Sequence, residues 1–169
     1  MKKILILNGA GRKNGKTAAM VKAFADAASA NGNEIIECFL HDMNIAGCIN
    51  CDKCKLKDVN SPEPCAQKDD MNEIYPAIRK ADVIVFASPV YFWDITGTLK
   101  TAVDRLHALV PYFRTQVYKE TVLLMTSGGS KIDHVKEWCH GFERWFGWKS
   151  LGEAMNDMEK ARAIGASIK

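Results

Sequence analysis

The 169-residue sequence has no apolar run that approaches the ~20 residues needed to span a bilayer. Its first apolar run, Ile4–Leu7, is too short for the core of a signal peptide and is followed at once by Asn8 and Gly9. The net charge of +3 is too small to indicate a nucleic-acid or anionic-membrane partner. We therefore expect a cytoplasmic protein with no nucleic-acid partner and no membrane partner.

Internal repeats, low-complexity tracts and linkers rich in proline, glycine or serine are also absent. A chain of this length can bury about two-thirds of its unfolded surface, so we expect residues 1–169 to form a single domain. One irregular insertion, at about residues 44–68, contains four of the six cysteines. Because thiols stay reduced in the cytoplasm, these cysteines indicate metal, cluster or redox chemistry before disulfides.

Short apolar segments alternate with segments of helical periodicity along the chain. We predict strands at Lys3–Asn8, Glu34–Leu40, Asp82–Ala87, Thr121–Thr126 and Ser150–Ala154. Apolar residues at helical spacing predict helices between them, and a last helix at Asp157–Lys169. This order predicts an α/β fold in which a doubly wound parallel sheet has helices on both faces. Ligands of such folds bind beyond the carboxyl ends of the strands.

The segment from Asn8 to Thr17 joins the first predicted strand to the first predicted helix. Its glycines let backbone N–H groups turn toward a bound anion, and the N-terminus of the helix adds partial positive charge. Arg12 and Lys16 add full charges, and Thr17 adds a hydroxyl donor. A plain strand-to-helix turn would explain the glycines but not their coincidence with these residues. The segment therefore predicts a phosphate site.

This loop is also close to the P-loop of nucleotide triphosphatases. The residues Ala10, Gly15, Lys16 and Thr17 match that pattern, with alanine in place of its first glycine. Such a site also needs an acidic residue at the end of a buried strand to help hold magnesium. The predicted strands run instead into Ser88 and Ser127. A nucleotide triphosphatase is therefore a remote alternative.

The same loop resembles the phosphate loop of the NAD(P)H-dependent FMN reductase family of flavodoxin-like proteins. It departs from the family pattern at Ala10, Gly11 and Lys16, where the family often has Ser, Pro and Asn. The resemblance implies a flavodoxin-like fold with five parallel strands in the order 2-1-3-4-5. It also implies an FMN whose phosphate is held by the residues of this loop: Gly11, Arg12, Asn14, Gly15, Lys16 and Thr17.

Two further loops support this resemblance. The first is similar to the Ser-Pro-x-Tyr motif of the family, and by resemblance it borders the isoalloxazine ring through Ser88, Pro89, Val90, Tyr91, Phe92 and Trp93. Filling of the core or of an interface is the alternative for Phe92 and Trp93. The second is a glycine-rich loop that family members place beside the flavin, here Ser127, Gly128 and Gly129. The segment Leu99–Arg105 is similar to a helix of the family, and we interpret its Lys100, Asp104 and Arg105 as a structural ion network.

The cysteine spacing resembles that of iron–sulfur flavoproteins, which are relatives of the same family. The four cysteines of the insertion are Cys48, Cys51, Cys54 and Cys65. The tight spacing of the first three suits a [4Fe–4S] cluster, because a short loop can wrap three thiolates around one cube. The gap of ten residues before the fourth is longer than in those relatives. A structural zinc site and free or redox-active thiols therefore remain alternatives.

The resemblance implies an FMN-dependent oxidoreductase that passes electrons from NAD(P)H or a donor protein to a flavin, a quinone or another acceptor. Because the flavin supplies the chemistry, we expect no catalytic acid–base residue. An iron–sulfur flavoprotein or a flavodoxin-like electron carrier without its own turnover is the alternative. Aromatic residues near positions 91–93 and 112–113 predict a homodimer or homotetramer.

Overall fold

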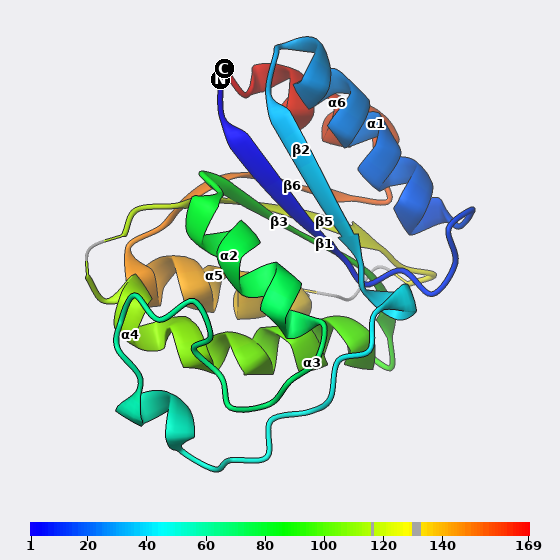
Figure 1. The fold of residues 1–169 in the computed structure, drawn as a ribbon. Coiled ribbons are helices and arrows are strands. Elements are labelled where there is room, and N and C mark those ends of the chain that lie inside the picture. Colours follow the sequence, from blue (N-terminus) through cyan, green and yellow to red (C-terminus); the bar gives the residue numbers. More distant parts are fainter. Residues whose placement is uncertain (116, 130–132) are drawn as a thin grey trace.

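A computed structural model describes residues 1–115, 117–129 and 133–169. Its centre is a twisted sheet with the strand order β2-β1-β3-β5-β6, and all neighbours along this path are parallel (Figure 1). The strands are β1 (Lys3–Asn8), β2 (Glu34–Phe39), β3 (Val83–Tyr91), β5 (Glu120–Thr126) and β6 (Lys149–Met155).

The predicted flavodoxin-like fold is confirmed. The path of parallel strands is the predicted order 2-1-3-4-5, once the short β4 (Asp94–Ile95) is set aside. β4 pairs antiparallel with the end of β3, outside that path. The sequence pattern did not predict it, because two residues are too short a segment to show any periodicity.

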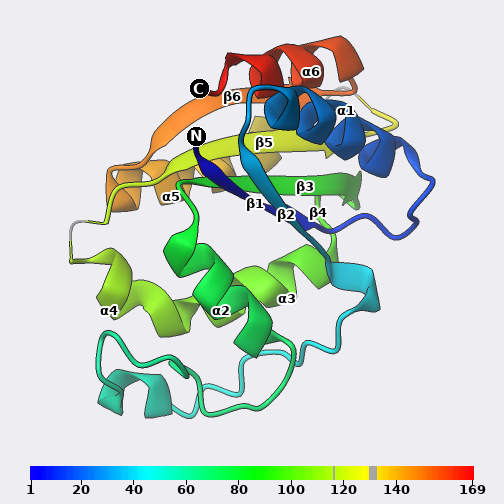
Figure 2. The same ribbon diagram turned by 45° about the horizontal axis from the view of Figure 1, so that its top comes forward.

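Helices cover both faces of the sheet, as predicted (Figure 2). One face carries α1 (Lys16–Ala30) and α6 (Met158–Ser167). The other face carries α2 (Met71–Lys80), α3 (Gly97–Arg105), α4 (Val110–Phe113) and α5 (Asp133–Phe146). Short 3₁₀ turns complete the chain at η1 (Leu40–Asp42), η2 (Lys53–Leu56) and η3 (Leu106–Leu109). No helix in the described ranges is long and apolar enough to cross a membrane.

The alternation of side chains along each strand divides the core into two layers. In β1, Ile4 and Ile6 pack beneath α1 and α6, whereas Leu5 and Leu7 pack beneath α2 and α3. All four side chains are buried. A strand covered on both faces has no solvated side, which explains why β1 reads as a continuous apolar run in the sequence.

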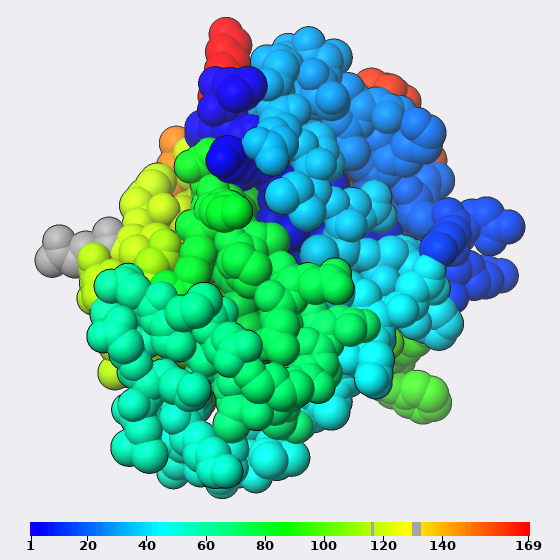
Figure 3. All heavy atoms as spheres, viewed as in Figure 1, coloured from blue at the N-terminus to red at the C-terminus, as the bar shows by residue number. Residues whose placement is uncertain are grey.

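The insertion between β2 and α2 lies on the surface next to α2 (Figure 3). It has little regular structure, and hydrogen bonds attach it to the helices. The side chain of Asp70 accepts from the backbone N–H of Asn44 at 2.6 Å. The guanidinium of Arg79 donates to the carbonyl oxygens of Val59 and Ser61 at 2.9 and 3.1 Å. These attachments fix a segment that could not form a core of its own.

The aromatic residues near positions 112–113 are not the exposed surface that we expected. Phe113 is buried, and its ring packs edge-on against Phe146 and Trp148, with centroids 5.2 and 5.0 Å apart. Tyr112 is half-buried beneath the guanidinium of Arg79. Both rings pack in the core layer that contains α5. The expectation of an oligomer is therefore supported only by residues 91–93.

Candidate functional site

The loop between β1 and α1 presents uncapped backbone N–H groups. Gly15 is the N-cap residue of α1, and no side chain accepts a hydrogen bond from the first turn. The first N–H groups of a helix have no partner within the helix. They therefore remain available to an anion, whose charge the helix N-terminus also favours.

The start of this loop is held tightly against the sheet and α3. The N–H of Gly9 donates to the carbonyl of Ala87 at 2.8 Å. Thr96, the N-cap of α3, donates its hydroxyl to the carbonyl of Gly9 at 2.9 Å. A Cβ atom on Gly9 would lie 2.7 Å from Oγ1 of Thr96 and 2.8 Å from Cβ of Leu99. Only glycine fits there without displacing its neighbours.

The three predicted loops meet at one cavity of about 250 Å³ at the carboxyl ends of β1, β3 and β5. The first part of the second loop is strand instead, because Ser88–Tyr91 continue β3. This is the edge of the sheet where ligands of such folds bind. Ten of the residues predicted for the site line the cavity: Gly11, Arg12, Gly15, Lys16, Thr17, Pro89, Val90, Tyr91, Ser127 and Gly128. Thr126 and Asn156 line it as well.

Other predicted residues lie outside this cavity's lining. Asn14 borders a separate groove between the loop, α1 and β2. Ser88 is fully buried, and its hydroxyl accepts from the backbone N–H of Thr96 at 3.0 Å, so it holds the start of α3. Phe92 and Trp93 stand on the exposed rim, and Gly129 follows Ser127 in the third loop. Their roles stay predictions.

A pair of threonines lines the cavity, Thr17 from the first turn of α1 and Thr126 from the end of β5. Thr17 is buried, and its hydroxyl lies 2.6 Å from that of Thr126 at the end of β5. Each hydroxyl has one hydrogen, so the pair satisfies one donor and leaves the other hydroxyl free to donate. The expected hydroxyl donor is therefore shared between the two threonines.

Asn156 is a site residue that the sequence reasoning missed. Its side-chain oxygen accepts from the N–H of Ser127 at 2.9 Å, and its amide donates to the carbonyl of Ser127 at 2.8 Å. This two-point bond fixes the third loop at the cavity. Asn156 follows the last strand directly, so its place at the carboxyl edge of the sheet was a usable signal.

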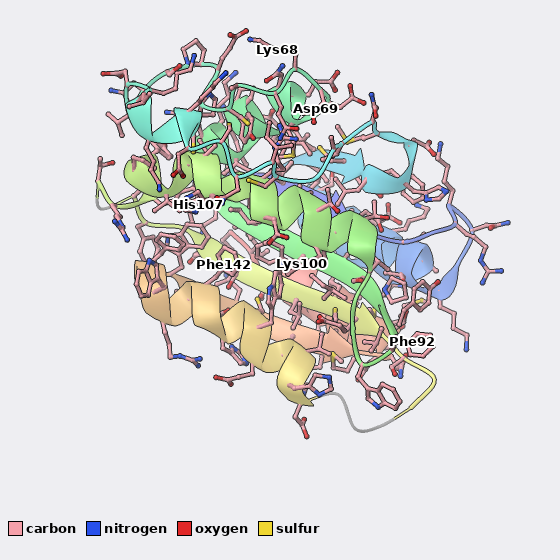
Figure 4. The ribbon with its side chains drawn as sticks, turned by 90° about the horizontal axis from the view of Figure 1, so that it is seen from below. Lys68, Asp69, Phe92, Lys100, His107 and Phe142 are labelled. Atoms are coloured by element: carbon pink, nitrogen blue, oxygen red, sulfur yellow. The ribbon has the colours of Figure 1, made fainter. Side chains whose placement is uncertain are left out.

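A tight hairpin carries the aromatic rim. Tyr91 pairs with Asp94, so Phe92 and Trp93 form a two-residue turn, and their φ angles are 49° and 65°. Two positive φ angles define a type I′ turn, which normally contains Asn and Gly. Bulky residues are strained in this conformation, and such strain is concentrated at functional sites. The two side chains are 93% and 66% exposed, and Phe92 projects at the edge of the molecule (Figure 4).

The four cysteines of the insertion line a second, small cavity of about 30 Å³, together with Arg105 and His107. Cys48 and Cys51 are exposed, whereas Cys54 and Cys65 are half-buried. Across the described ranges, the side chains of His, Cys, Asp and Glu form no group of three or more placed to hold a metal ion. The structure thus gathers the four thiols around one cavity without drawing them into a ligand sphere.

The other two cysteines have packing roles, as expected. Cys139 is buried in the core beneath α5, and burial raises the pKa of its thiol far above the usual range. Cys38 is half-buried on β2, where burial and then the charge of Glu73 raise its pKa to about 11. Both thiols stay protonated at neutral pH, which makes them poor nucleophiles.

The predicted ion network on α3 is wrong for one member. Lys100 and Asp104 form an exposed pair at i and i+4. Arg105 is not part of it, because adjacent helix residues point in different directions. Its guanidinium is buried and forms a two-point ion pair with Asp69, with N–O distances of 2.5 and 3.1 Å. It also donates to the carbonyl of Ala46 at 2.8 Å and to Sγ of Cys65 at 3.4 Å.

This ion pair changes the charge around the cysteine cavity. Burial disfavours the thiolate of Cys65, but hydrogen bonding from Gln67 and the charge of Arg105 outweigh it, and the pKa of Cys65 lies below its usual range. Burial likewise opposes ionisation of Asp69, yet its bonds with Arg105 hold its pKa below the usual range. In the same cavity burial raises the pKa of Cys54, so the two half-buried thiols differ in acidity.

Similar proteins with curated descriptions include two iron–sulfur flavoproteins of Archaeoglobus fulgidus. One is 26% identical over 99% of this chain and 79% of its own length. The other is 33% identical over 61% of this chain, and the match spans about half of that relative, 48% of its length. Among solved structures, the NAD(P)H:quinone oxidoreductase from Methanothermobacter marburgensis has the same fold, with a TM-score of 0.72 at 18% identity over 99% of each chain.

A family model adds a match that reaches across nearly the whole chain. The model of NADPH-dependent FMN reductase covers residues 2–155, which include the three loops of the larger cavity and the cysteine insertion. The predicted class of FMN-dependent oxidoreductase, with NAD(P)H as its co-substrate, is thereby confirmed. By its sequence and its fold, the chain belongs to the NADPH-dependent FMN reductase family.

Proposed function

We propose that the cavity at the carboxyl edge of the sheet binds FMN. The phosphate is held by the loop from Gly11 to Thr17, and the ring lies between Pro89–Tyr91 and Ser127–Gly128. The observation that carries this proposal is the convergence of these three loops on one cavity at the uncapped start of α1. A dianionic phosphate there meets backbone N–H groups and two basic side chains at once.

The bound flavin would supply hydride and electron transfer. The residues of the chain bind and orient it. Arg12 and Lys16 neutralise the phosphate, and the bond between Asn156 and Ser127 fixes one wall of the cavity. Phe92 and Trp93 form the rim that shields the ring from water, and Gly129 extends the third loop beside it. Asn14 is part of the phosphate loop, and Ser88 acts through Thr96, which it holds in place.

Residues 1–169 form a single cytoplasmic FMN-binding domain in this proposal. Its reaction takes electrons from NAD(P)H or a donor protein and passes them to a flavin, a quinone or another acceptor. The exposed aromatic rim supports a homodimer or homotetramer, because aromatic residues are enriched at such interfaces. Steady-state assays with NADH or NADPH as donor and quinones or ferricyanide as acceptor test this reaction. If neither nucleotide reduces the purified protein, the protein is an electron carrier without its own turnover.

The binding site is tested with the double variant Arg12→Ala/Lys16→Ala. Each hydrogen bond between a charged side chain and phosphate contributes about 1.5–3 kcal/mol, so the Kd for FMN should rise at least about tenfold for each residue. Lys13→Ala is the matched control, because Lys13 lies in the same loop but pairs with Asp42 outside the cavity. Unchanged FMN affinity in the double variant would place the phosphate elsewhere.

We further propose that Cys48, Cys51, Cys54 and Cys65 hold a [4Fe–4S] cluster. Two observations support it: the four thiols line one cavity, and the buried Nε of Arg105 at that cavity has no hydrogen-bond partner among the described residues. The names of the similar iron–sulfur flavoproteins are in accord. When bound, the cluster would exchange single electrons with FMN. A structural zinc ion or free thiols are the competing occupancies.

Metal analysis separates these three cases. Anaerobically purified protein should contain about four iron and four sulfide per chain and show a broad brown absorbance beside the flavin bands. Cys51→Ser should lose the iron. Cys38→Ser is the control, since Cys38 lies on β2 and does not line the cysteine cavity. Zinc in place of iron, or metal-free protein after reconstitution, would contradict the cluster.

A further inference from the structure

The side chain of Arg105 sits at the wall of the cysteine cavity. Arg105 ends α3, and its side chain is only 1% exposed. Burying a charge is costly unless it is paired, and Asp69 supplies that pair. The remaining hydrogen-bonding capacity of the guanidinium is then directed at the insertion.

Arg105 fastens both ends of the cysteine segment. One Nη donates to the carbonyl of Ala46, two residues before Cys48. The other Nη donates to the sulfur of Cys65. Tyr75 of α2 also lies against the sulfur of Cys65, but it does not contact the start of the cysteine segment as Arg105 does. One side chain thereby closes the loop that contains all four thiols.

The third nitrogen of the guanidinium lacks a partner. Nε of Arg105 is buried and makes no hydrogen bond with any residue that the structure describes. Buried polar groups in native proteins are nearly always hydrogen-bonded, so such a group calls for a partner. The same side chain lines the cavity of the four cysteines. Sulfur atoms of a metal cluster accept N–H hydrogen bonds, and they would supply that partner.

We propose that Arg105 is the positioning residue of the metal cluster. It holds Cys65 as the fourth ligand despite the gap of ten residues that separates this cysteine from Cys54, and it places a fixed positive charge against the cluster. This inference rests on the proposed [4Fe–4S] cluster and assigns a role within it that the cysteine motif does not contain.

The charge of Arg105 has a defined effect on the redox equilibrium. Reduction adds one electron to the cluster and breaks no bond, so the cluster becomes more negative by one charge. A neighbouring guanidinium stabilises the more negative state, and hydrogen bonds to the sulfurs act in the same direction. Arg105 therefore raises the midpoint potential, and its removal lowers it.

Two variants separate the placement of Cys65 from the charge. Arg105→Gln loses the positive charge and the hydrogen bonds to Ala46 and Cys65. The iron content should therefore fall at least about twofold. The cluster that remains should be harder to reduce by about tenfold, which is about 59 mV for one electron. In Arg105→Lys the charge and the pairing with Asp69 are kept, so iron should fall similarly while the potential stays near that of the original protein.

Arg79→Gln is the matched control. Arg79 is also attached to the insertion, through Val59 and Ser61, and its Nε is likewise buried without a partner. It does not line the cysteine cavity. Its loss should leave the iron content and the midpoint potential unchanged, even where it loosens the insertion.

Iron and sulfide analysis of purified protein and a spectroelectrochemical titration are the two measurements. Iron content and potential in both Arg105 variants equal to those of the original protein would overturn the inference and leave the cluster itself standing. Equal losses in Arg79→Gln and Arg105→Gln would also overturn it, because any anchor of the insertion would then suffice. Original protein without iron would instead remove the cluster on which the inference rests. Where Arg105→Gln does not fold, Arg105→Lys alone decides the placement of Cys65.

Discussion

Gly9 shows how one missing side chain fixes the position of the phosphate loop. Its neighbours Thr96 and Leu99 would lie within 2.8 Å of a Cβ atom, and Thr96 uses the same close approach to bond the carbonyl of Gly9. The position of the phosphate loop therefore depends on the lack of a Cβ atom at Gly9, two residues before Gly11, the first residue expected to contact the ligand.

We predict that Gly9→Ala destabilises the protein by about 1–3 kcal/mol, because an added methyl group overpacks this contact. It should also weaken FMN binding, since the loop must move. Urea denaturation and FMN titration measure the two effects. Gly11→Ala is the stability control, because its Cβ would meet only the hydroxyl of Tyr91, at 4.0 Å. A Gly9→Ala variant as stable as Gly11→Ala would contradict the close packing.

Lys119 is a buried lysine whose ammonium closes the end of α2. Its Nζ donates to the carbonyl of Ala81 at 2.5 Å, and the side chain is almost fully buried. Burial lowers its pKa from the ordinary 10.5 to about 8, although the charge of Asp82 opposes this. The folded protein thus loses a proton at a pH where the unfolded chain still keeps it.

We predict that this difference makes stability rise with pH. Below pH 8 both states hold the proton, and the cost of burying the charge is fully present. Between pH 8 and 10.5 the unfolded state binds more protons, so the free energy of unfolding increases, by about 3 kcal/mol in total. Urea denaturation at pH 7.5, 9 and 10.5 measures the rise. Lys119→Met should lack it, and parallel curves for the two proteins would show that other groups cause it.

At the scale of elements, the β3–β4 hairpin combines an unfavourable turn with an exposed position. Phe92 and Trp93 occupy two positive φ angles and remain largely exposed to solvent. Aromatic residues at these two positions do not stabilise the fold, because Asn and Gly are preferred in such a turn and polar residues are preferred on the surface. We therefore expect these aromatic residues to contact another molecule, as proposed for the rim of the FMN site.

We predict that Phe92→Asn/Trp93→Gly stabilises the FMN-free protein by about 1–2 kcal/mol, because it relieves the strained turn. The same change should impair catalysis or assembly, since the rim is lost. Thermal unfolding and steady-state assays measure these effects. The variant Phe92→Ser/Trp93→Ser removes the rings but keeps residues with a Cβ in the turn, so an equal gain in stability there would assign the effect to exposure and not to the backbone.

At the scale of the whole molecule, ligand binding should be coupled to stability. A ligand that binds only the folded state adds about 2.7 kcal/mol when its concentration is 100 times its Kd. For a chain of this size that is a rise in Tm of roughly 5–10 °C. We predict this shift on addition of FMN, and its loss in Arg12→Ala/Lys16→Ala. ATP with magnesium serves as the comparison, and a larger shift with it would favour the triphosphatase alternative.

Local patterns predicted the sheet because each strand carries its own signal. The apolar run of β1 and the glycines and basic residues after it lie within one short segment. The three loops could be placed together because the carboxyl ends of parallel strands share one edge. Contacts between distant residues carried no such signal. The pair of Arg105 with Asp69 spans 36 residues, and the bond of Thr96 to Gly9 spans 87. These contacts form only when the helices pack onto the sheet, and the periodicity of the sequence does not show which helix residues then meet.

The helix α3 is attached at both ends, to the phosphate loop through Thr96 and to the cysteine segment through Arg105. Its nine residues span about 13 Å as a rigid rod. Each residue added to a helix turns its far end by about 100°. A single insertion in α3 would therefore leave Thr96 in place while it rotated Arg105 out of the cavity and carried it further along. The proposed FMN site and the cysteine cavity are thus coupled through one helix, because its length and winding set both the spacing between them and the direction in which Arg105 faces.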